Sequence, residues 1–346
     1  MKRFFALLLL ASFLPAAAQT LVERTDNVPF GRLDGGIVLG TTGIGLELST
    51  PLADFVQLRA GFSLVPTVQL PLSFAIPGAD AEPTVDEDGE LVPSTFDRLS
   101  GLLQDMTGCT VDDQFDAVAT PHFRNLHVMA DFRPLRSFPQ WHLTAGFLWG
   151  TSNIGTLVNA QEEAPLLVAL STYNRLYDKA ANDDPLLSYG DFDLYNLTLN
   201  NKLLGHGRLG VEMGQRTSDG STFVLEPDEQ GVIRATMQVN AFKPYLGTGF
   251  EGCFSHRKDG WRYAIDLGAL FWGGAPRVVT TDHCRTLVEK EDEYGFPYTE
   301  WEYSTSTIDL VHDVQDVPGR PGEMLNLVRR LKVYPVIELR LTHRLF

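Results

Sequence analysis

Charged side chains of both signs recur in stretches that otherwise alternate between apolar and polar residues. Seven of them are the candidate site residues: Glu47, Arg59, Glu251, Arg262, Asp266, Glu338 and Arg340. The apolar residues around them occupy every second position, so the charges share the opposite face of an extended chain. Such a set either forms ion pairs or lines a narrow pore that selects ions. An unpaired buried charge is costly, and this favours the ion-pair network.

A second group of side chains has the character of a calcium site. Asp86, Asp88 and Glu90 alternate around Gly89, as carboxylates do in calcium-binding loops. The segment is not an EF-hand, because Asp97 stands where that loop needs a bidentate glutamate. Calcium is the one candidate cofactor, and the alternative is an acidic, solvated loop.

Catalytic residues are harder to identify. His122, His142 and His206 are candidates only for an enzyme that acts on lipid or peptide. The sequence has no Gly-x-Ser-x-Gly elbow, Walker loop or His-Glu-x-x-His motif, and this favours a protein that is not an enzyme. The cysteines have no zinc spacing, and Cys109 and Cys284 are candidates for a disulfide between two long loops.

The elements that must position these residues are strands, because hydrophobicity has period two. In 55–64, Leu58 and Phe62 share the apolar face, whereas Gln57 and Ser63 share the polar one. The same alternation predicts seven strands: 36–49, 55–65, 122–133, 141–150, 243–254, 261–273 and 331–345. Strands of about ten residues with one apolar face are long enough to cross a membrane. Further strands are expected in 207–214, 221–226 and 231–240, so the predicted range is 8–12 strands, with 10 the best estimate.

A soluble sandwich alternates in the same way, but two features favour an all-β, antiparallel transmembrane β-barrel. The polar face is rich in glycine with single charges, and the apolar face begins or ends with aromatic residues. The connections at 51–54, 134–140 and 255–260 are short, whereas those at 75–121, 151–206 and 274–330 are long. Short periplasmic turns and long extracellular loops are typical of outer-membrane barrels.

The long loops contain two predicted amphipathic helices and an excess of acid. Apolar residues recur at helical spacing in 94–106 and in 165–180, which predicts a lid over the barrel, with a plug in the lumen as the alternative. The 346 residues include 44 acidic and 28 basic side chains, which gives a net charge of −16. That charge excludes nucleic acid as a partner and leaves small cationic solutes or a surface ligand as candidates.

The start of the chain has the layout of an export signal. Lys2 and Arg3 precede an apolar run at 4–14, and small residues lead up to Ala18. We therefore expect a signal peptide at 1–18 and a single barrel domain at 19–346; a buried N-terminal helix is the alternative. No later stretch is long enough for a transmembrane helix.

Several segments resemble small Gram-negative outer-membrane β-barrel proteins of the porin-like and OmpA–Opa-like class. Residues 43–47 and 58–62 are similar to their opening hairpin, and 243–250 and 263–271 resemble a Pro-Tyr-x-Gly-x-Gly strand and its neighbour. The chain ends on Phe346, as in barrels recognised by the insertion machinery, although the preceding apolar residues are out of phase with it. The resemblance implies an outer-membrane location and brings no catalytic residues.

The sequence thus predicts an outer-membrane barrel with acidic surface loops and a structural, surface-binding or narrow-pore role. Membrane lipid and the insertion machinery are the expected partners. One alternative is an outer-membrane enzyme that acts on lipid or peptide at the loop rim. Another is a secreted soluble β-protein that binds a ligand.

Overall fold

The computed structural model describes residues 29–75 and 114–345, apart from 186, 190–191, 255–259 and 292–296, together with scattered positions between 84 and 112. The predicted signal peptide, most of the predicted helix at 94–106 and the calcium candidates Asp86, Asp88 and Glu90 lie outside the described residues.

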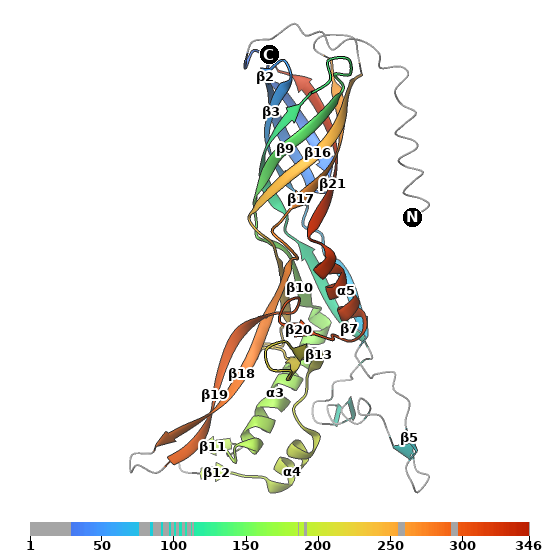
Figure 1. The fold of residues 1–346 in the computed structure, drawn as a ribbon. Coiled ribbons are helices and arrows are strands. Elements are labelled where there is room, and N and C mark those ends of the chain that lie inside the picture. The colour runs from blue at the N-terminus through green and yellow to red at the C-terminus, as the bar shows by residue number, and fades with distance from the viewer. Residues whose placement is uncertain are drawn as a thin grey trace.

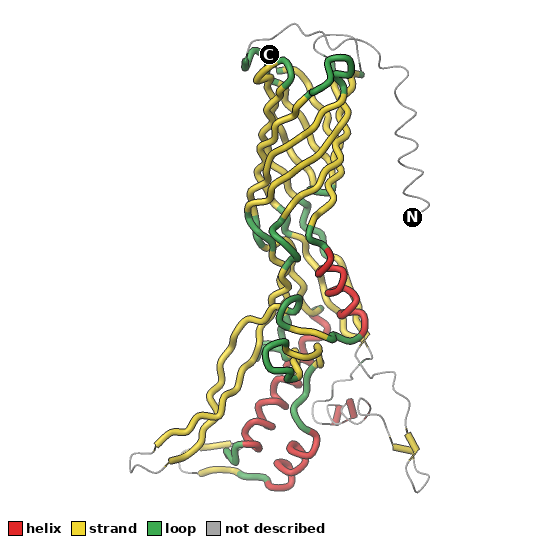
Figure 2. The backbone as a smooth tube through the Cα atoms, viewed as in Figure 1, coloured by secondary structure: helices red, strands yellow, loops and turns green. Residues whose placement is uncertain are grey.

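Eight antiparallel strands form a closed barrel in the order β1-β2-β3-β8-β9-β16-β17-β21. Their bounds are β1 (Asp34–Gly40), β2 (Gly43–Ala53), β3 (Val56–Leu64), β8 (Arg124–Phe132), β9 (Trp141–Gly150), β16 (Phe242–Cys253), β17 (Arg262–Phe271) and β21 (Val333–Arg344). The barrel closes because β1 pairs with β2 on one side and β21 on the other (Figures 1 and 2). Closure leaves the barrel without an unpaired edge.

The best estimate of ten barrel strands is wrong, and the predicted strand 36–49 accounts for part of the error. This segment is a hairpin that turns at Thr41 and Thr42, so it supplies both β1 and β2. Gly43 follows the turn with a φ of +106°, and a Cβ there would lie 2.1 Å from the Leu64 carbonyl oxygen. Glycine is needed at this position for both reasons. The other six predicted strands each match one barrel strand.

The remaining error comes from strands that form outside the barrel. The three segments expected to complete the barrel contain β13 (Val211–Arg216), β14 (Thr222–Leu225) and β15 (Arg234–Gln238). β13 pairs with β14 and β20 (Val314–Gln315) in a three-stranded sheet, and β15 belongs to a six-stranded sheet. All three have six residues or fewer, too short to span a bilayer.

The six-stranded sheet extends the barrel wall beyond one end of the barrel. Its order is β19-β18-β15-β10-β7-β4, and its new strands are β4 (Leu70–Ala75), β7 (Gln114–Pro121), β10 (Asn153–Asn159), β18 (Arg277–Glu291) and β19 (Pro297–Asp309). Five of the six strands directly follow or precede a barrel strand in the chain, and they keep the order of those barrel strands. Figure 1 shows the sheet leaving one end of the barrel, which we call the loop end; the opposite end, where β1 begins and β21 ends, is the turn end.

Three described helices pack beside this sheet, and we call the whole region the extramembrane domain. They are α3 (Ala164–Ala181), α4 (Leu197–His206) and α5 (Gly319–Arg330). The prediction of a helix at 165–180 is confirmed by α3, which packs on α4 outside the barrel and so does not plug the lumen (Figure 1). The smaller elements are β5 (Thr84–Val85), β6 (Leu91–Val92), η1 (Gln161–Glu163), β11 (Leu187–Tyr189) and β12 (Phe192–Leu194). None of the described helices is long and apolar enough to cross a membrane.

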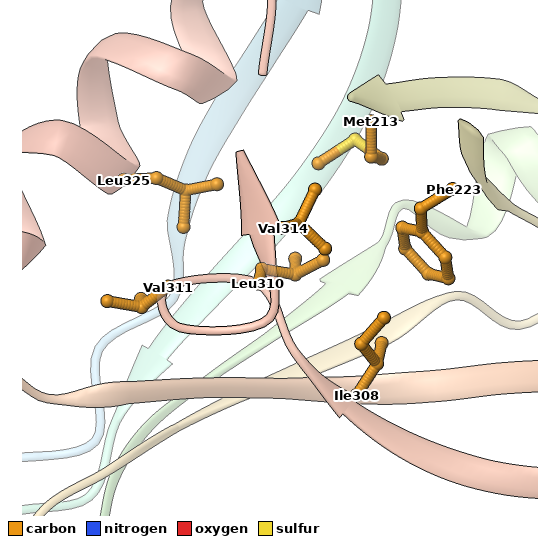
Figure 3. Close-up of a cluster of buried hydrophobic side chains, with 7 residues drawn as sticks. All are labelled: Met213, Phe223, Ile308, Leu310, Val311, Val314 and Leu325. Atoms are coloured by element: carbon orange, nitrogen blue, oxygen red, sulfur yellow. The ribbon is translucent and has the colours of Figure 1, made fainter. Parts of the chain in front are cut away.

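The extramembrane domain has hydrophobic cores of its own. One lies between β13, β14, β19, β20, α5 and the turn from β19 to β20, and it contains Met213, Phe223, Ile308, Leu310, Val311, Val314 and Leu325 (Figure 3). A second, between α3 and α4, contains Tyr173, Ala180, Leu203 and Leu209. Because these cores are separate from the barrel interior, the domain does not depend on lumen residues for its packing.

Candidate functional site

The outer wall of the barrel is apolar. Leu46 on β2 is 69% exposed, whereas its neighbour Glu47 is 3% exposed. The same alternation continues along β3, where Phe62 is 39% exposed and Ser63 is 2% exposed. The predicted strand phase is confirmed on both strands. A closed barrel with an apolar outer wall satisfies every backbone hydrogen bond internally, as a bilayer requires.

Exposed aromatic side chains ring both ends of this wall. At the turn end they are Phe55, Phe132, Phe138, Phe250, Phe254 and Trp261; at the loop end they are Trp149, Phe242 and Phe271. Aromatic girdles mark the level of the lipid headgroups in transmembrane barrels. The two rings therefore place the membrane around the eight barrel strands and leave the extramembrane domain outside it.

An ion-pair network of two arginines and three carboxylates fills the middle of the lumen. Arg59 on β3 lies 2.9 Å from a carboxylate oxygen of Glu47 on β2 and 2.9 Å from one of Asp131 on β8. Arg340 on β21 donates to Asp266 on β17 and lies 3.5 Å from Glu47. All five side chains are at most 4% exposed. This lumen network connects five strands across the barrel. Removal of one partner from a buried ion pair strongly destabilises the fold, because it leaves an uncompensated buried charge.

Two histidines extend the lumen network. His127 Nε2 lies 3.1 Å from a carboxylate oxygen of Glu47, and His142 Nε2 lies 2.7 Å from one of Asp266. His142, which the sequence offered as a catalytic candidate, is 0% exposed. A buried histidine held against a carboxylate inside the barrel has no path to a substrate at the loop rim.

A second layer of charges closes the turn end. Arg133 lies 2.7 Å from Glu251, and Arg262 lies 3.6 Å from the same carboxylate. Asp34 continues the layer, 2.8 Å from Arg32 and 3.8 Å from Arg262. These side chains are between 4% and 18% exposed, so they are more accessible to solvent than the lumen network, but each still has an ion-pair partner.

An apolar seal closes the lumen at the loop end. It consists of Phe123, Met129, Leu148, Tyr245, Leu270 and Val336, each 7% exposed or less. Lys243 is 0% exposed at its edge, and its ammonium donates to the Asn125 side chain at 3.0 Å and to the carbonyls of Thr151 and Ala241. The same ammonium lies 5.5 Å from the centre of the Phe123 ring, within range of a cation–π contact.

The structure places six of the seven predicted lumen charges in ion pairs. Four of the seven belong to the lumen network, and Glu251 and Arg262 belong to the turn-end layer. The seventh, Glu338, accepts a hydrogen bond of 2.7 Å from the Thr42 hydroxyl. The four in the lumen network are at most 4% exposed, so paired side chains fill the middle of the lumen, whereas Glu251, Arg262 and Glu338 are half-buried.

Other candidates are scattered. His122 precedes β8 and is half-buried, and His206 ends α4. Cys253 is an exposed free thiol at the end of β16. Cys284 on β18 is also a free thiol, 3.3 Å from the Ser306 hydroxyl, so the structure does not form the expected disulfide with Cys109, which itself lies outside the described residues.

The extramembrane domain contains a charge cluster that sequence reasoning missed. Arg208 forms two hydrogen bonds to Glu226, of 2.6 and 2.5 Å, and also binds Asp178 on α3. Arg285 on β18 lies 3.2 Å from Asp178 and 3.4 Å from Glu226. Burial acts to lower the pKa of Arg208, but its bonds to the two carboxylates outweigh that effect and raise the pKa above its usual value. This clasp joins α3 and β18 to the two segments that flank the β13–β14 hairpin.

Comparisons with known proteins give distant similarities. No family profile matches the sequence, and no curated protein matches it. The crystal structure of CarO from Acinetobacter baumannii aligns with a TM-score of 0.35 at 14% identity, over 92% of this chain and 99% of that one. The structure of Acinetobacter baumannii CarO2 aligns with a TM-score of 0.36 at 13% identity, over 90% and 98%. The closed eight-stranded barrel with its apolar wall and aromatic girdles identifies the chain as an outer-membrane β-barrel protein.

Proposed function

We propose that the protein is a sealed membrane anchor that holds the extramembrane domain at the cell surface. The filled lumen is the observation that carries this proposal. Asp131, His142 and Asp266 are 0% exposed, and Arg59 is 2% exposed, in the middle of the barrel. With an apolar seal at one end and a paired charge layer at the other, the barrel is expected to have no continuous aqueous path.

The direction of the domain follows from the connections. At the turn end, β2 connects to β3 through two residues, and β8 connects to β9 through eight. Three long connections leave the loop end, and outer-membrane barrels place long connections outside the cell. A signal peptide at 1–18 would deliver the chain to this membrane. With a net charge of −16, the chain favours a cationic solute or a positively charged surface ligand.

Cysteine reactivity tests the sealed lumen. With Cys109, Cys253 and Cys284 changed to serine, Ser63→Cys places a thiol in the lumen wall, where the Ser63 hydroxyl makes no hydrogen bond to the described residues. A charged, water-soluble thiol reagent should leave this variant unlabelled until the barrel unfolds. Ser304→Cys, on the exposed face of β19, is the matched control and should react at once. Equal rates at the two positions in the folded protein would contradict the sealed lumen.

The orientation is tested by the same reagent on intact cells. Ser304→Cys should be labelled from outside, whereas Ser137→Cys, in the exposed turn between β8 and β9, should react only after the outer membrane is opened. Labelling of Ser137→Cys alone in intact cells would invert the topology. It would leave the sealed lumen standing, so the two parts of the proposal fail separately.

A further inference from the structure

A groove of about 500 Å³ lies on the barrel at its turn end. Two hairpin turns form it, the turn between β2 and β3 and the turn between β8 and β9. Its lining combines apolar side chains, among them Leu52, Phe55 and Phe132, with Asp54 and Arg136. None of these five residues takes part in the lumen network, so the groove is separate from the interior of the barrel.

The groove lies at the depth of the lipid headgroups. Phe55 and Phe132 belong to the turn-end aromatic girdle and pack edge to face, with their ring centres 5.6 Å apart. They are 49% and 42% exposed, so half of this aromatic pair faces outward. Girdle residues lie at the boundary between the acyl chains and the headgroups. A molecule in the groove would therefore meet acyl chains on the side toward the membrane centre and water on the side toward the turn end.

Two opposite charges are available in the groove. Arg133 also lines the groove, but its guanidinium donates to the Gln57 side chain at 2.6 Å and to the Glu251 carboxylate at 2.7 Å. Its charge is therefore already neutralised by Glu251. Arg136 and Asp54 are both exposed, and neither forms an ion pair with the described residues. The groove thus offers one free guanidinium, one free carboxylate and an apolar floor.

We propose that the groove binds the headgroup of an ethanolamine phospholipid. The phosphate would pair with the Arg136 guanidinium, which suits phosphate oxygens. The primary ammonium would donate to the Asp54 carboxylate, and the first part of an acyl chain would lie along Phe132. A phosphoglycerol headgroup carries no cation for Asp54, and a choline headgroup has no N–H to donate. The charge pattern therefore selects the phospholipid that has both a phosphate and a primary amine.

Native mass spectrometry of the full chain, released from detergent micelles, measures this binding. Each sample contains equal amounts of phosphatidylethanolamine, phosphatidylglycerol and phosphatidylcholine. The wild type should retain the ethanolamine lipid over the other two. Arg136→Ala should lower its retention by about tenfold, as expected when one charge-assisted contact of at least about 1.4 kcal/mol is lost. Asp54→Asn should remove the preference over phosphatidylglycerol while leaving phosphate binding intact.

Arg320→Ala provides the matched control, because Arg320 is an exposed arginine on α5 in the extramembrane domain. It should retain lipid as the wild type does. Each variant is first checked for the faster gel mobility of an unboiled barrel, so that loss of lipid is read only from folded protein. Equal retention by Arg136→Ala and the wild type, or no preference among the three lipids in the wild type, would overturn the proposal.

Discussion

Replacement of Arg340 by leucine should sharply destabilise the barrel. Arg340 is 3% exposed and donates to Asp266. It also lies 3.5 Å from Glu47 and 3.6 Å from Asp131. Arg340→Leu leaves three buried carboxylates with Arg59 as the one guanidinium of the lumen network. Breaking a buried ion pair by removing one partner costs about 3–5 kcal/mol, and three carboxylates lose a partner here, so we expect the upper part of that range.

Urea unfolding of the barrel from lipid vesicles, followed by tryptophan fluorescence, measures this loss. The double variant Arg340→Leu with Asp266→Asn provides the control, because it removes one of the stranded charges while the amide can still bond His142. The double variant should regain about 1–3 kcal/mol of the free energy of unfolding that the single variant loses, the usual size of coupling between contacting residues. A loss below about 1 kcal/mol in Arg340→Leu would refute the network as a determinant of stability. So would a double variant that is no more stable than the single one.

Three further predictions concern the membrane face and the extramembrane domain. Leu46→Arg places a charge on a side chain that is 69% exposed to lipid and should cost about 2–4 kcal/mol in the same urea assay; Leu197→Arg, at a position 76% exposed on α4, should change stability by at most about 0.5 kcal/mol. The hydrogen bond from Arg216 lowers the pKa of Asp282, so the stabilisation is complete above the unfolded-state pKa of about 4 and is lost as pH falls through the lowered pKa. Hydrogen exchange of β18 should therefore show a protection gap between the wild type and Asp282→Asn at neutral pH that closes in acid; a gap of constant size would be inconsistent with this linkage. Arg208→Ala should speed proteolysis between α4 and β14 without altering the gel mobility of the barrel, and an unchanged cleavage rate would show that the clasp does not hold this segment.

The strand phase and the lumen charges could be predicted because both follow from local periodicity. On a membrane strand, Leu46 and Glu47 differ in environment as much as two neighbours can, so the alternation is strong. The barrel strand count could not be predicted in the same way. The exposed apolar residues change from odd positions before the turn at Thr41 and Thr42 (Ile37 and Leu39) to even positions after it (Ile44 and Leu46). The single predicted strand 36–49 overlooked this change of phase, which marks the hairpin together with the positive φ of Gly43.

The charge clasp was missed for a different reason. Asp178 lies on α3 and Arg285 on β18, whereas Arg208 and Glu226 lie in connecting segments, and no spacing along the chain relates the four. They meet only in the folded domain, where Arg285 on β18 lies 3.2 Å from Asp178 on α3. Contacts between distant segments can be predicted only once the strand order is known. The residues that face the lumen can be predicted from the sequence of one strand at a time.

The central claim is that the folded barrel conducts no ions, and planar-bilayer recording tests it most directly. Protein with the mobility of a folded barrel is inserted into a lipid bilayer in salt solution, and boiled protein serves as the control. The filled lumen predicts no unitary current steps at any voltage that the bilayer withstands. Regular current steps of one size, obtained from folded protein and absent from boiled protein, would contradict the sealed lumen and with it the anchor function.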